Sequence, residues 1–372
     1  MKHAKQRQAT YYKLTLLISS MLCIIGLIFI YSASSAFALE RIGNAHFYVR
    51  KQSFGFLLGI IILGFTYCIP FGLIQALAPL IFVGALFLTG ITLIPGIGRT
   101  VHGSSRWISL FLFNFQPGEL LKIAFMLAVA RLCAKTTPAT FKLKKVLPPT
   151  LILLIPASLI LLKQPDFGTF VMLVTITASF LFVAGMSTRR FVIASGIMLP
   201  ILATLIALRP YRVKRILTFL DPWKNPQGAG FQIIQSLIAI ASGGLYGQGI
   251  GFSKQKFFYL PMQHTDFIFS IITEESGLIG AMIIIISFVA LIYLIMRIAL
   301  LAQNRFAFFV ALGSAIILGT QAAINIGVAL GMLPTKGISL PFVSYGNSSL
   351  ISTLLMIGLV GASIHAKPDQ AT

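Results

Sequence analysis

The sequence predicts an all-α polytopic membrane protein of about ten transmembrane helices, with a large extracytoplasmic loop between helices 7 and 8. The first observation is composition: of 372 residues, 57% are hydrophobic and only 10% are charged. Soluble domains usually carry about 25% charged residues. The second observation is a series of apolar windows of about 20 residues, the length that crosses a bilayer as a helix. The third is the placement of lysine and arginine at the ends of these windows.

The apolar windows define the domain organisation. They begin near Leu14, Ser53, Leu73, Glu119, Val146, Gly168, Phe191, Asp266, Phe308 and Ser348. We therefore predict an N-terminal tail over residues 1–13 and a membrane domain over 14–366. The membrane domain includes the large outer loop at 208–265, and a C-terminal tail follows over 367–372.

Basic residues near the window ends predict the orientation, because short basic loops stay cytoplasmic. Their pattern predicts a multi-pass membrane protein with cytoplasmic N- and C-termini. The outer loop breaks the rule. It contains Arg209, Arg212, Lys214, Arg215, Lys224, Lys254 and Lys256. An anionic ligand would explain these outer charges.

The net charge of +21 raises the possibility of a nucleic-acid partner. The basic residues, however, are scattered through the segments that flank the windows rather than gathered in one soluble domain. This distribution argues against nucleic acid. It fits attraction to anionic lipid head groups, worth about 1 kcal/mol per basic residue near the surface.

A glycine-rich stretch, GGLYGQGIGFSKQK from Gly243 to Lys256, lacks the preceding strand that a dinucleotide-binding motif requires. Two interpretations stay open. The stretch is a flexible connector, or its backbone N–H groups and two lysines surround a phosphate. The apolar stretch from Phe231 to Gly244 also has two interpretations: it lies in the membrane interface, or it packs on the outer loop.

Three carboxylates are expected to converge on the outer side of the membrane. Asp266 lies at the outer mouth of the eighth window, and Glu119 opens the fourth. The chain folds back between the fifth and sixth windows, which places Asp166 on the same face. His264 precedes Asp266 and is expected at the interface.

Glu274 and Glu275 present a different problem. In an uninterrupted helix, Glu274 would lie about two turns deeper than Asp266, at about 1.5 Å per residue. An ionised group there costs about 2.5 to 3.5 kcal/mol unless it is paired or hydrated. We interpret both glutamates as members of an internal ion-pair network, with Lys122 and Arg131 as the expected partners. Lys122 also lies one helical turn from Glu119, which makes Glu119 a second possible partner for it.

Several segments together resemble one protein family. LPMQHTDFIFSIITEESG and GMLPTKGISLPFVSYGNSS resemble signature segments of the SEDS family, the shape, elongation, division and sporulation proteins. GSSRWI, FQPGELLKIA and LLKQPDFGT match further stretches of its pattern in the same order. GIGFSKQKFFYLP and PTKGISLPF are more similar to the division and sporulation branch than to the elongation branch.

The resemblance implies a ten-span peptidoglycan glycosyltransferase that polymerises lipid II at the outer face of the plasma membrane, at the division septum. The essential carboxylate of the family falls on Asp266, and the glutamate of its QPSE stretch falls on Glu119. Three departures stand out: Met262 replaces a glutamate, Gly118 replaces the serine of QPSE, and Asn347 replaces a glycine. None of them changes Asp266.

The implied chemistry assigns roles to the candidates. Glycan polymerisation with inversion needs a base for the attacking hydroxyl and positive charge for the departing diphosphate. Asp266 is the predicted base, and Glu119 is the second predicted catalytic residue. The predicted substrate-binding residues are Arg106, Lys122, Arg212, Arg215, Lys254, Lys256, His264 and Lys336. The sequence establishes no cofactor, and a divalent cation, Mg²⁺ or Mn²⁺, bridged by Asp266 or Glu119 stays open.

The expected partners are lipid II, the growing glycan strand, a class B penicillin-binding transpeptidase and other division proteins. Two other functions stay open. A lipid II flippase or transporter would use the same substrate but would need polar access from both faces. A non-catalytic division scaffold would make the carboxylates dispensable.

Overall fold

The computed structural model describes residues 2–101, 104–109, 114–256 and 261–369. Long helices dominate the fold, as predicted. They are α1 Lys2–Ile42, α2 Phe47–Cys68, α3 Phe71–Ile91, α4 Pro117–Ala134, α5 Leu143–Lys163, α6 Phe167–Ala184, α7 Thr188–Ala207, α8 Pro210–Leu220, α9 Phe231–Gly243, α10 Ile268–Leu300, α11 Arg305–Ala329 and α12 Asn347–Ile364. An unpredicted antiparallel sheet joins α3 to α4, in the order β1 Gly98–Val101, β2 Ser104–Ser109 and β3 Asn114–Phe115.

Within the described residues, nine helices are long and apolar enough to cross a membrane. The 18-residue helix α4 has the same length as α6 and α12, but it carries Glu119, Lys122 and Arg131. Most of its side chains are buried, because α4 packs against α3, α5, α6, α11 and α12. Counting α4 as a span would give ten, and that total stays a prediction.

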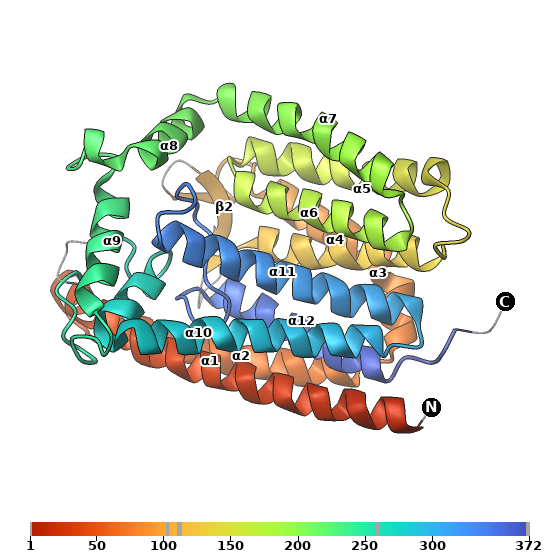
Figure 1. Ribbon diagram of the computed structural model, residues 1–372, viewed down its shortest axis with the longest axis horizontal. Coiled ribbons are helices and arrows are strands. Elements are labelled where there is room, and N and C mark those ends of the chain that lie inside the picture. The colour runs from red at the N-terminus through yellow and green to blue at the C-terminus, as the bar shows by residue number, and fades with distance from the viewer. Residues whose placement is uncertain (1, 102–103, 110–113, 257–260, 370–372) are drawn as a thin grey trace.

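The two ends of the bundle differ (Figure 1). The N- and C-termini lie at one end, whereas α8, α9 and β2 lie toward the other. Helix α1 begins at Lys2, so the residues of the predicted N-terminal tail continue the first helix. Residues 257–260 of the predicted outer loop and 370–372 of the predicted C-terminal tail lie outside the described residues.

The predicted outer loop is partly helical. It contains α8, the short 3-10 helix η1 Pro222–Lys224, and α9. Helix α9 packs on α10 and α11, where the Ser236 hydroxyl contacts that of Ser270 at 2.6 Å and donates to the carbonyl of Ala329 at 2.7 Å. The Phe231–Gly244 stretch is therefore packed on protein.

The eighth predicted span is broken. Gly277 interrupts α10 with φ 67° and ψ −167°, a left-handed conformation that glycine adopts without steric cost. Glu274 lies before this break, in the same helical segment as Ile268, so the break does not test the expected depth of Glu274. That Glu274 lies about two turns deeper than Asp266 stays a prediction. The segment before Gly277 and the span after it are separate helices.

Candidate functional site

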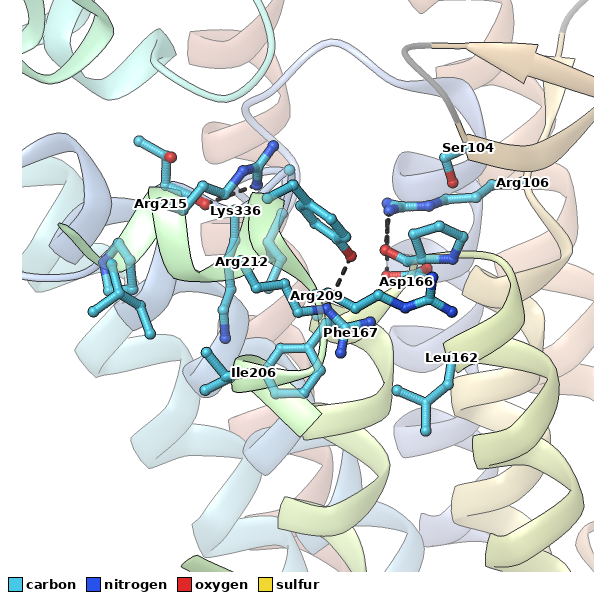
Figure 2. A pocket seen from close by; sticks show the side chains of 18 of the residues that line it. Ser104, Arg106, Leu162, Asp166, Phe167, Ile206, Arg209, Arg212, Arg215 and Lys336 are labelled. Atoms are coloured by element: carbon cyan, nitrogen blue, oxygen red, sulfur yellow. Dashed lines mark hydrogen bonds and ion pairs between the residues drawn. The ribbon is translucent and has the colours of Figure 1, made fainter. Parts of the chain in front are cut away.

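A cavity of about 720 Å³ lies where β2, the α5–α6 junction, the α7–α8 junction and the loop after α11 meet. Its lining carries six basic side chains and one carboxylate, Arg106, Lys163, Arg209, Arg212, Arg215, Lys336 and Asp166. Figure 2 shows Arg106 and Asp166 on one side, with Arg215 and Lys336 on the other. A concave site with this excess of positive charge favours an anionic ligand.

Arg106 ties the sheet to the α5–α6 junction. Its guanidinium donates to the carbonyls of Pro165 at 2.5 Å and Gln164 at 3.3 Å. It also lies 3.7 Å from the Asp166 carboxylate. Asp166 caps α6 by accepting from the backbone N–H of Thr169 at 3.2 Å and from its hydroxyl at 2.8 Å. Asp166 is therefore engaged in holding the cavity wall.

Arg212 on α8 is buried and already occupied. It donates to the carbonyl of Leu205 at 2.7 Å and to the Tyr211 hydroxyl at 2.9 Å. Its guanidinium lies 4.7 Å from the ring centroid of Phe167. This set of contacts fixes α8 against α6 and α7 and leaves Arg212 as a wall of the site.

The charged groups of Arg215 and Lys336 make fewer described contacts than those of Arg106 and Arg212. Arg215 is exposed and makes one described hydrogen bond, to the carbonyl of Thr335 at 2.9 Å. The ammonium of Lys336 lies 5.2 Å from the Phe167 ring centroid. Burial lowers the pKa of Lys336, and the nearby charge of Arg215 lowers it further. A bound anion would relieve this repulsion.

Asp266 stands directly behind the cavity wall. A Cβ added to Gly337, which lines the cavity, would lie 3.6 Å from a carboxylate oxygen of Asp266. Within the described residues, that carboxylate makes no hydrogen bond or ion pair. Burial raises the pKa of Asp266 to about 6, and the charges of Arg215 and Arg106 lower it in part. Asp266 is thus a half-buried carboxylate with free acceptor capacity beside a basic cavity.

The backbone around Asp266 is firmly held. The Tyr345 N–H donates to the carbonyl of His264 at 2.9 Å, and the Ser344 hydroxyl donates to that of Thr265 at 2.7 Å. The Asn325 side chain donates to the carbonyl of Asp266 at 2.9 Å. Three successive carbonyls therefore have donors, which orients the carboxylate toward the loop that forms the cavity wall.

Glu119 does not face the cavity. Its carboxylate pairs with Lys122 at 2.9 Å, as the spacing predicted, and accepts from the Ser352 hydroxyl at 3.0 Å. Its neighbour Gly118 lies beside Asp166, since a Cβ there would be 3.7 Å from the Asp166 carboxylate. Asp166 thus lines the cavity and Asp266 lies behind its wall, whereas Glu119 and Lys122 are buried in a contact between α4 and α12. The convergence of the three carboxylates on the outer side of the membrane stays a prediction.

Lys256 is occupied elsewhere. Its ammonium is buried, lies 3.3 Å from the Glu275 carboxylate and donates to the carbonyl of Gly251. This corrects the prediction that Lys256 binds substrate. The backbone N–H of Lys254 donates to the Glu274 carboxylate at 2.9 Å. The Lys254 residue is exposed and does not belong to the cavity lining.

Glu274 and Glu275 form an internal network, as interpreted, but the expected partners Lys122 and Arg131 were wrong. Glu275 accepts from the Ser32 hydroxyl at 2.6 Å and from the Ser253 N–H at 3.4 Å, in addition to its pairing with Lys256. Glu274 accepts from the Ser253 hydroxyl. The two carboxylates therefore lock α1, α10 and the glycine-rich stretch together.

The glycine-rich stretch is neither a loose connector nor a phosphate cradle. The N–H groups of Gln248 and Gly249 donate to the carbonyls of Glu274 and Glu275 at 2.9 and 3.0 Å. A Cβ at Gly247 would collide with the Glu275 carbonyl. The stretch satisfies the backbone groups that the break at Gly277 exposes, which is why it needs glycine.

His264 lies in an aromatic cluster rather than in the cavity lining. Its ring centroid is 4.5 Å from that of Tyr48 and 5.6 Å from that of Tyr345. Burial lowers the pKa of His264 to about 4, and its Nδ1 atom has no hydrogen-bond partner in the part of the chain that the structure describes. A neutral, enclosed imidazole fits packing better than substrate contact.

The sequence missed several lining residues. Arg209 belongs to the basic outer loop but is not among the predicted substrate-binding residues. Lys163 is three residues from the candidate Asp166 in the sequence, which is a signal that could have identified it. Phe167 and Tyr211, whose side chains contact Arg212, carried no signal, because their place depends on how α6, α7 and α8 meet.

A predicted cation finds only partial support in the protein side chains. Within the described ranges, no group of three or more His, Cys, Asp or Glu side chains is placed to hold a metal. Glu119 is paired with Lys122, which leaves Asp266 as the available carboxylate. A cation on Asp266 would take its remaining ligands from substrate oxygens or water.

Comparison with known proteins identifies the family. The model of a family described as Cell cycle protein, named for FtsW, RodA and SpoVE, matches residues 12–368. The chain belongs to the FtsW/RodA/SpoVE family. This confirms the resemblance to the SEDS family, since the matched segment covers nearly the whole chain.

Individual members of the FtsW/RodA/SpoVE family are similar over most of their length. A probable peptidoglycan glycosyltransferase FtsW of Geobacter sp. (strain M18) is 39% identical over 355 residues, 95% of this chain and 97% of the relative. Stage V sporulation protein E of Bacillus subtilis (strain 168) is 39% identical over 347 residues, 93% of this chain and 95% of the relative.

Solved structures of the family share this fold. A chain of a peptidoglycan synthase complex described as coordinating polymerization and crosslinking has a TM-score of 0.77 and 30% identity. The match covers 94% of this chain and 96% of that one. The rod shape determining protein RodA of Thermus thermophilus has a TM-score of 0.69 and 26% identity, over 94% and 95% of the two chains.

Proposed function

We propose that this protein is a peptidoglycan glycosyltransferase that polymerises lipid II at the outer face of the plasma membrane. The observation that carries the proposal is Asp266, a carboxylate without a described partner, beside a cavity with six basic side chains. The names of the FtsW relatives and their identity over most of the chain support the same activity. The likeness to FtsW supports a role in division.

Asp266 acts as the base. It takes the proton from the sugar hydroxyl that attacks the anomeric carbon, so a new glycosidic C–O bond forms as the C–O bond to diphosphate breaks. The base must be ionised at the operating pH, and it works best when its pKa lies close to that pH. A pKa of about 6 satisfies both requirements at neutral pH.

The basic wall stabilises the leaving group. Diphosphate gains negative charge as the bond breaks, and donors already placed around it lower the barrier without reorganising. Arg215 and Lys336 are the best placed for this role, and Arg209 also lines the cavity. Arg106 and Arg212 are used in contacts that hold the wall, so they act chiefly by shaping the site.

A partner follows from the structural likeness. The peptidoglycan synthase complex that this chain resembles coordinates polymerization with crosslinking. We therefore assign a class B penicillin-binding transpeptidase as partner, together with other division proteins at the septum. The orientation that fits this activity places α8, α9 and the cavity outside and both termini in the cytoplasm.

The proposal is tested by lipid II polymerisation with the purified protein and its transpeptidase, read as glycan ladders on a gel. Ladders are expected from the wild type and not from Asp266→Asn. Asp221→Asn is the matched control, since Asp221 lies in the same outer region and only caps η1. Equal ladders from wild type and Asp266→Asn would overturn the assignment of the base and favour a flippase or scaffold.

A further inference from the structure

The glycine-rich stretch exposes large apolar side chains. Leu245 is 60% exposed, Tyr246 81%, Ile250 62% and Phe252 71%. A contiguous exposed apolar group of this kind marks an interaction with lipid or protein. The stretch cannot fold back to bury these side chains, because its backbone is bonded to Glu274 and Glu275 on both sides of the turn.

The depth of the stretch follows from the break in α10. From Leu278 to Leu300 the second part of α10 is long enough, at about 1.5 Å per residue, to cross a hydrocarbon core of about 30 Å by itself. Its first amides are bonded to the stretch: Leu278 N–H donates to Gly244 at 2.9 Å and Ile279 N–H to Leu245 at 3.3 Å. The stretch therefore lies level with the outer edge of the span.

The exposed apolar surface is also continuous with that of the span. Leu278, Ile279 and Met282 are exposed on the first turns of α10 after the break. Lys254 follows the apolar side chains and is exposed as well. An apolar segment that ends in a lysine matches the boundary between acyl chains and phosphates, where lysine reaches outward to the head groups.

We propose that the segment Leu245–Phe252, here called the leaflet loop, is immersed in the acyl chains of the outer leaflet. The loop belongs to the segment that connects two spans on the outer side, yet it lies at the depth of the acyl chains. Through Glu274 and Glu275 it anchors the short helix that follows Asp266 to the plane of the membrane.

A tryptophan reporter tests this placement. Trp107 and Trp223 are replaced by phenylalanine, and Phe252→Trp supplies the only indole in protein reconstituted in vesicles of phosphatidylglycerol and phosphatidylethanolamine with brominated acyl chains. We expect loss of most of its emission relative to unbrominated vesicles. The control is Gln227→Trp in the exposed polar turn before α9, which is expected to keep most of its emission.

Two outcomes would overturn the leaflet loop. One is quenching of the Phe252→Trp indole no greater than that of the Gln227→Trp indole. The other is quenching that disappears when the partner transpeptidase is present, which would make the loop a protein interface. Leu278→Trp, on the span itself, reports whether the protein is correctly inserted in each preparation.

A second inference rests on the proposed function and on a separate set of hydrogen bonds. The buried Asn325 side chain on α11 donates to the carbonyl of Asp266 at 2.9 Å and to that of Ile338 at 2.8 Å. It therefore bridges the predicted base and the loop that carries Lys336. Its own side-chain oxygen is buried and has no hydrogen-bond partner among the described residues, so the side chain acts there only as a donor, through these two bonds.

We infer that Asn325 is a positioning residue that fixes the Asp266 carboxylate relative to the basic wall. A misplacement of about 1 Å can cost about 10²-fold in rate. Asn325→Ala is expected to lower kcat by up to that factor, with little change in KM for lipid II and a shifted acid limb of the pH profile. Asn325→Asp, which puts acceptors against both carbonyls, is expected to be worse.

Ser314→Ala is the matched control, because Ser314 is also buried on α11 but its described hydrogen bonds go to its own helix and to Met126. An inactive Asp266→Asn together with a wild-type kcat and pH profile for Asn325→Ala would overturn the positioning role alone. Full activity of Asp266→Asn would overturn the proposed function itself.

Discussion

Asp266 and Glu275 occur in one short stretch of chain, on either side of the first turns of α10, yet their surroundings are opposite. Glu275 is buried and accepts from Ser32 and Ser253 while it pairs with Lys256. Within the described residues, no group donates to the Asp266 carboxylate. A carboxylate whose acceptors are filled stabilises structure, whereas one whose acceptors are free can take a proton from a substrate.

The largest expected effect separates the two sites by rate. Asp266→Asn should lower polymerisation by about 10²- to 10⁴-fold, the usual contribution of a positioned base. It should not lower the unfolding temperature, because no described hydrogen bond of the side chain is lost and the cost of burying its charge is removed. Rate is measured on glycan ladders and stability by thermal unfolding in detergent. A variant that unfolds at lower temperature would assign Asp266 a structural role.

The second effect is on stability. Glu275→Gln leaves the Lys256 ammonium buried without its counter-charge, and breaking such a pair costs about 3 to 5 kcal/mol. The unfolding temperature should fall markedly. The double variant Glu275→Gln with Lys256→Met should recover much of the loss, since it removes the stranded charge. An unchanged single variant would contradict the network.

The third effect compares basic residues at the cavity with those in the glycine-rich stretch. Arg215→Gln and Lys336→Gln each remove a donor placed for diphosphate, and hydrogen bonds to charged groups are worth about 1.5 to 3 kcal/mol. Each change should lower kcat/KM for lipid II by about 10- to 10²-fold. Lys254→Gln, exposed and outside the cavity lining, should change it little. Equal losses in all three would contradict the choice of cavity.

The smallest effect is a pH dependence. Burial raises the pKa of Asp266 from 3.8 to about 6, so polymerisation should fall by about tenfold per unit below pH 6 as the base becomes protonated. The free energy of unfolding should change in the opposite direction. Because burial favours the protonated form, the contribution of Asp266 to stability should rise as the pH drops from about 6 toward 3.8. Asp266→Asn should abolish that stability trend. A polymerisation rate that stays constant between about pH 5 and pH 7 would contradict the expected loss of activity.

The glycine-rich stretch shows where sequence reasoning reaches its limit. Its glycines and lysines suggested a cradle for a ligand, and the backbone N–H groups of Ser253 and Lys254 do donate to anionic groups. Those groups are the chain's own Glu275 and Glu274 carboxylates. Nothing local to Gly243–Lys256 reveals this, because the partner is created by a helix break at Gly277 further along the chain.

Composition, window length and long motifs are local properties, so the sequence alone was enough to predict the membrane-spanning helical class and the family, and it pointed to Asp266 as the candidate base. It also paired Glu119 with Lys122, since residues three apart share a helix face. The tertiary structure decided which charges are free. Lys256 and Lys336 look alike in sequence, but one meets Glu275 inside the protein and the other lines the cavity. The physical reason is that a charge is available only where no other segment satisfies it, and the neighbouring segments are set by packing.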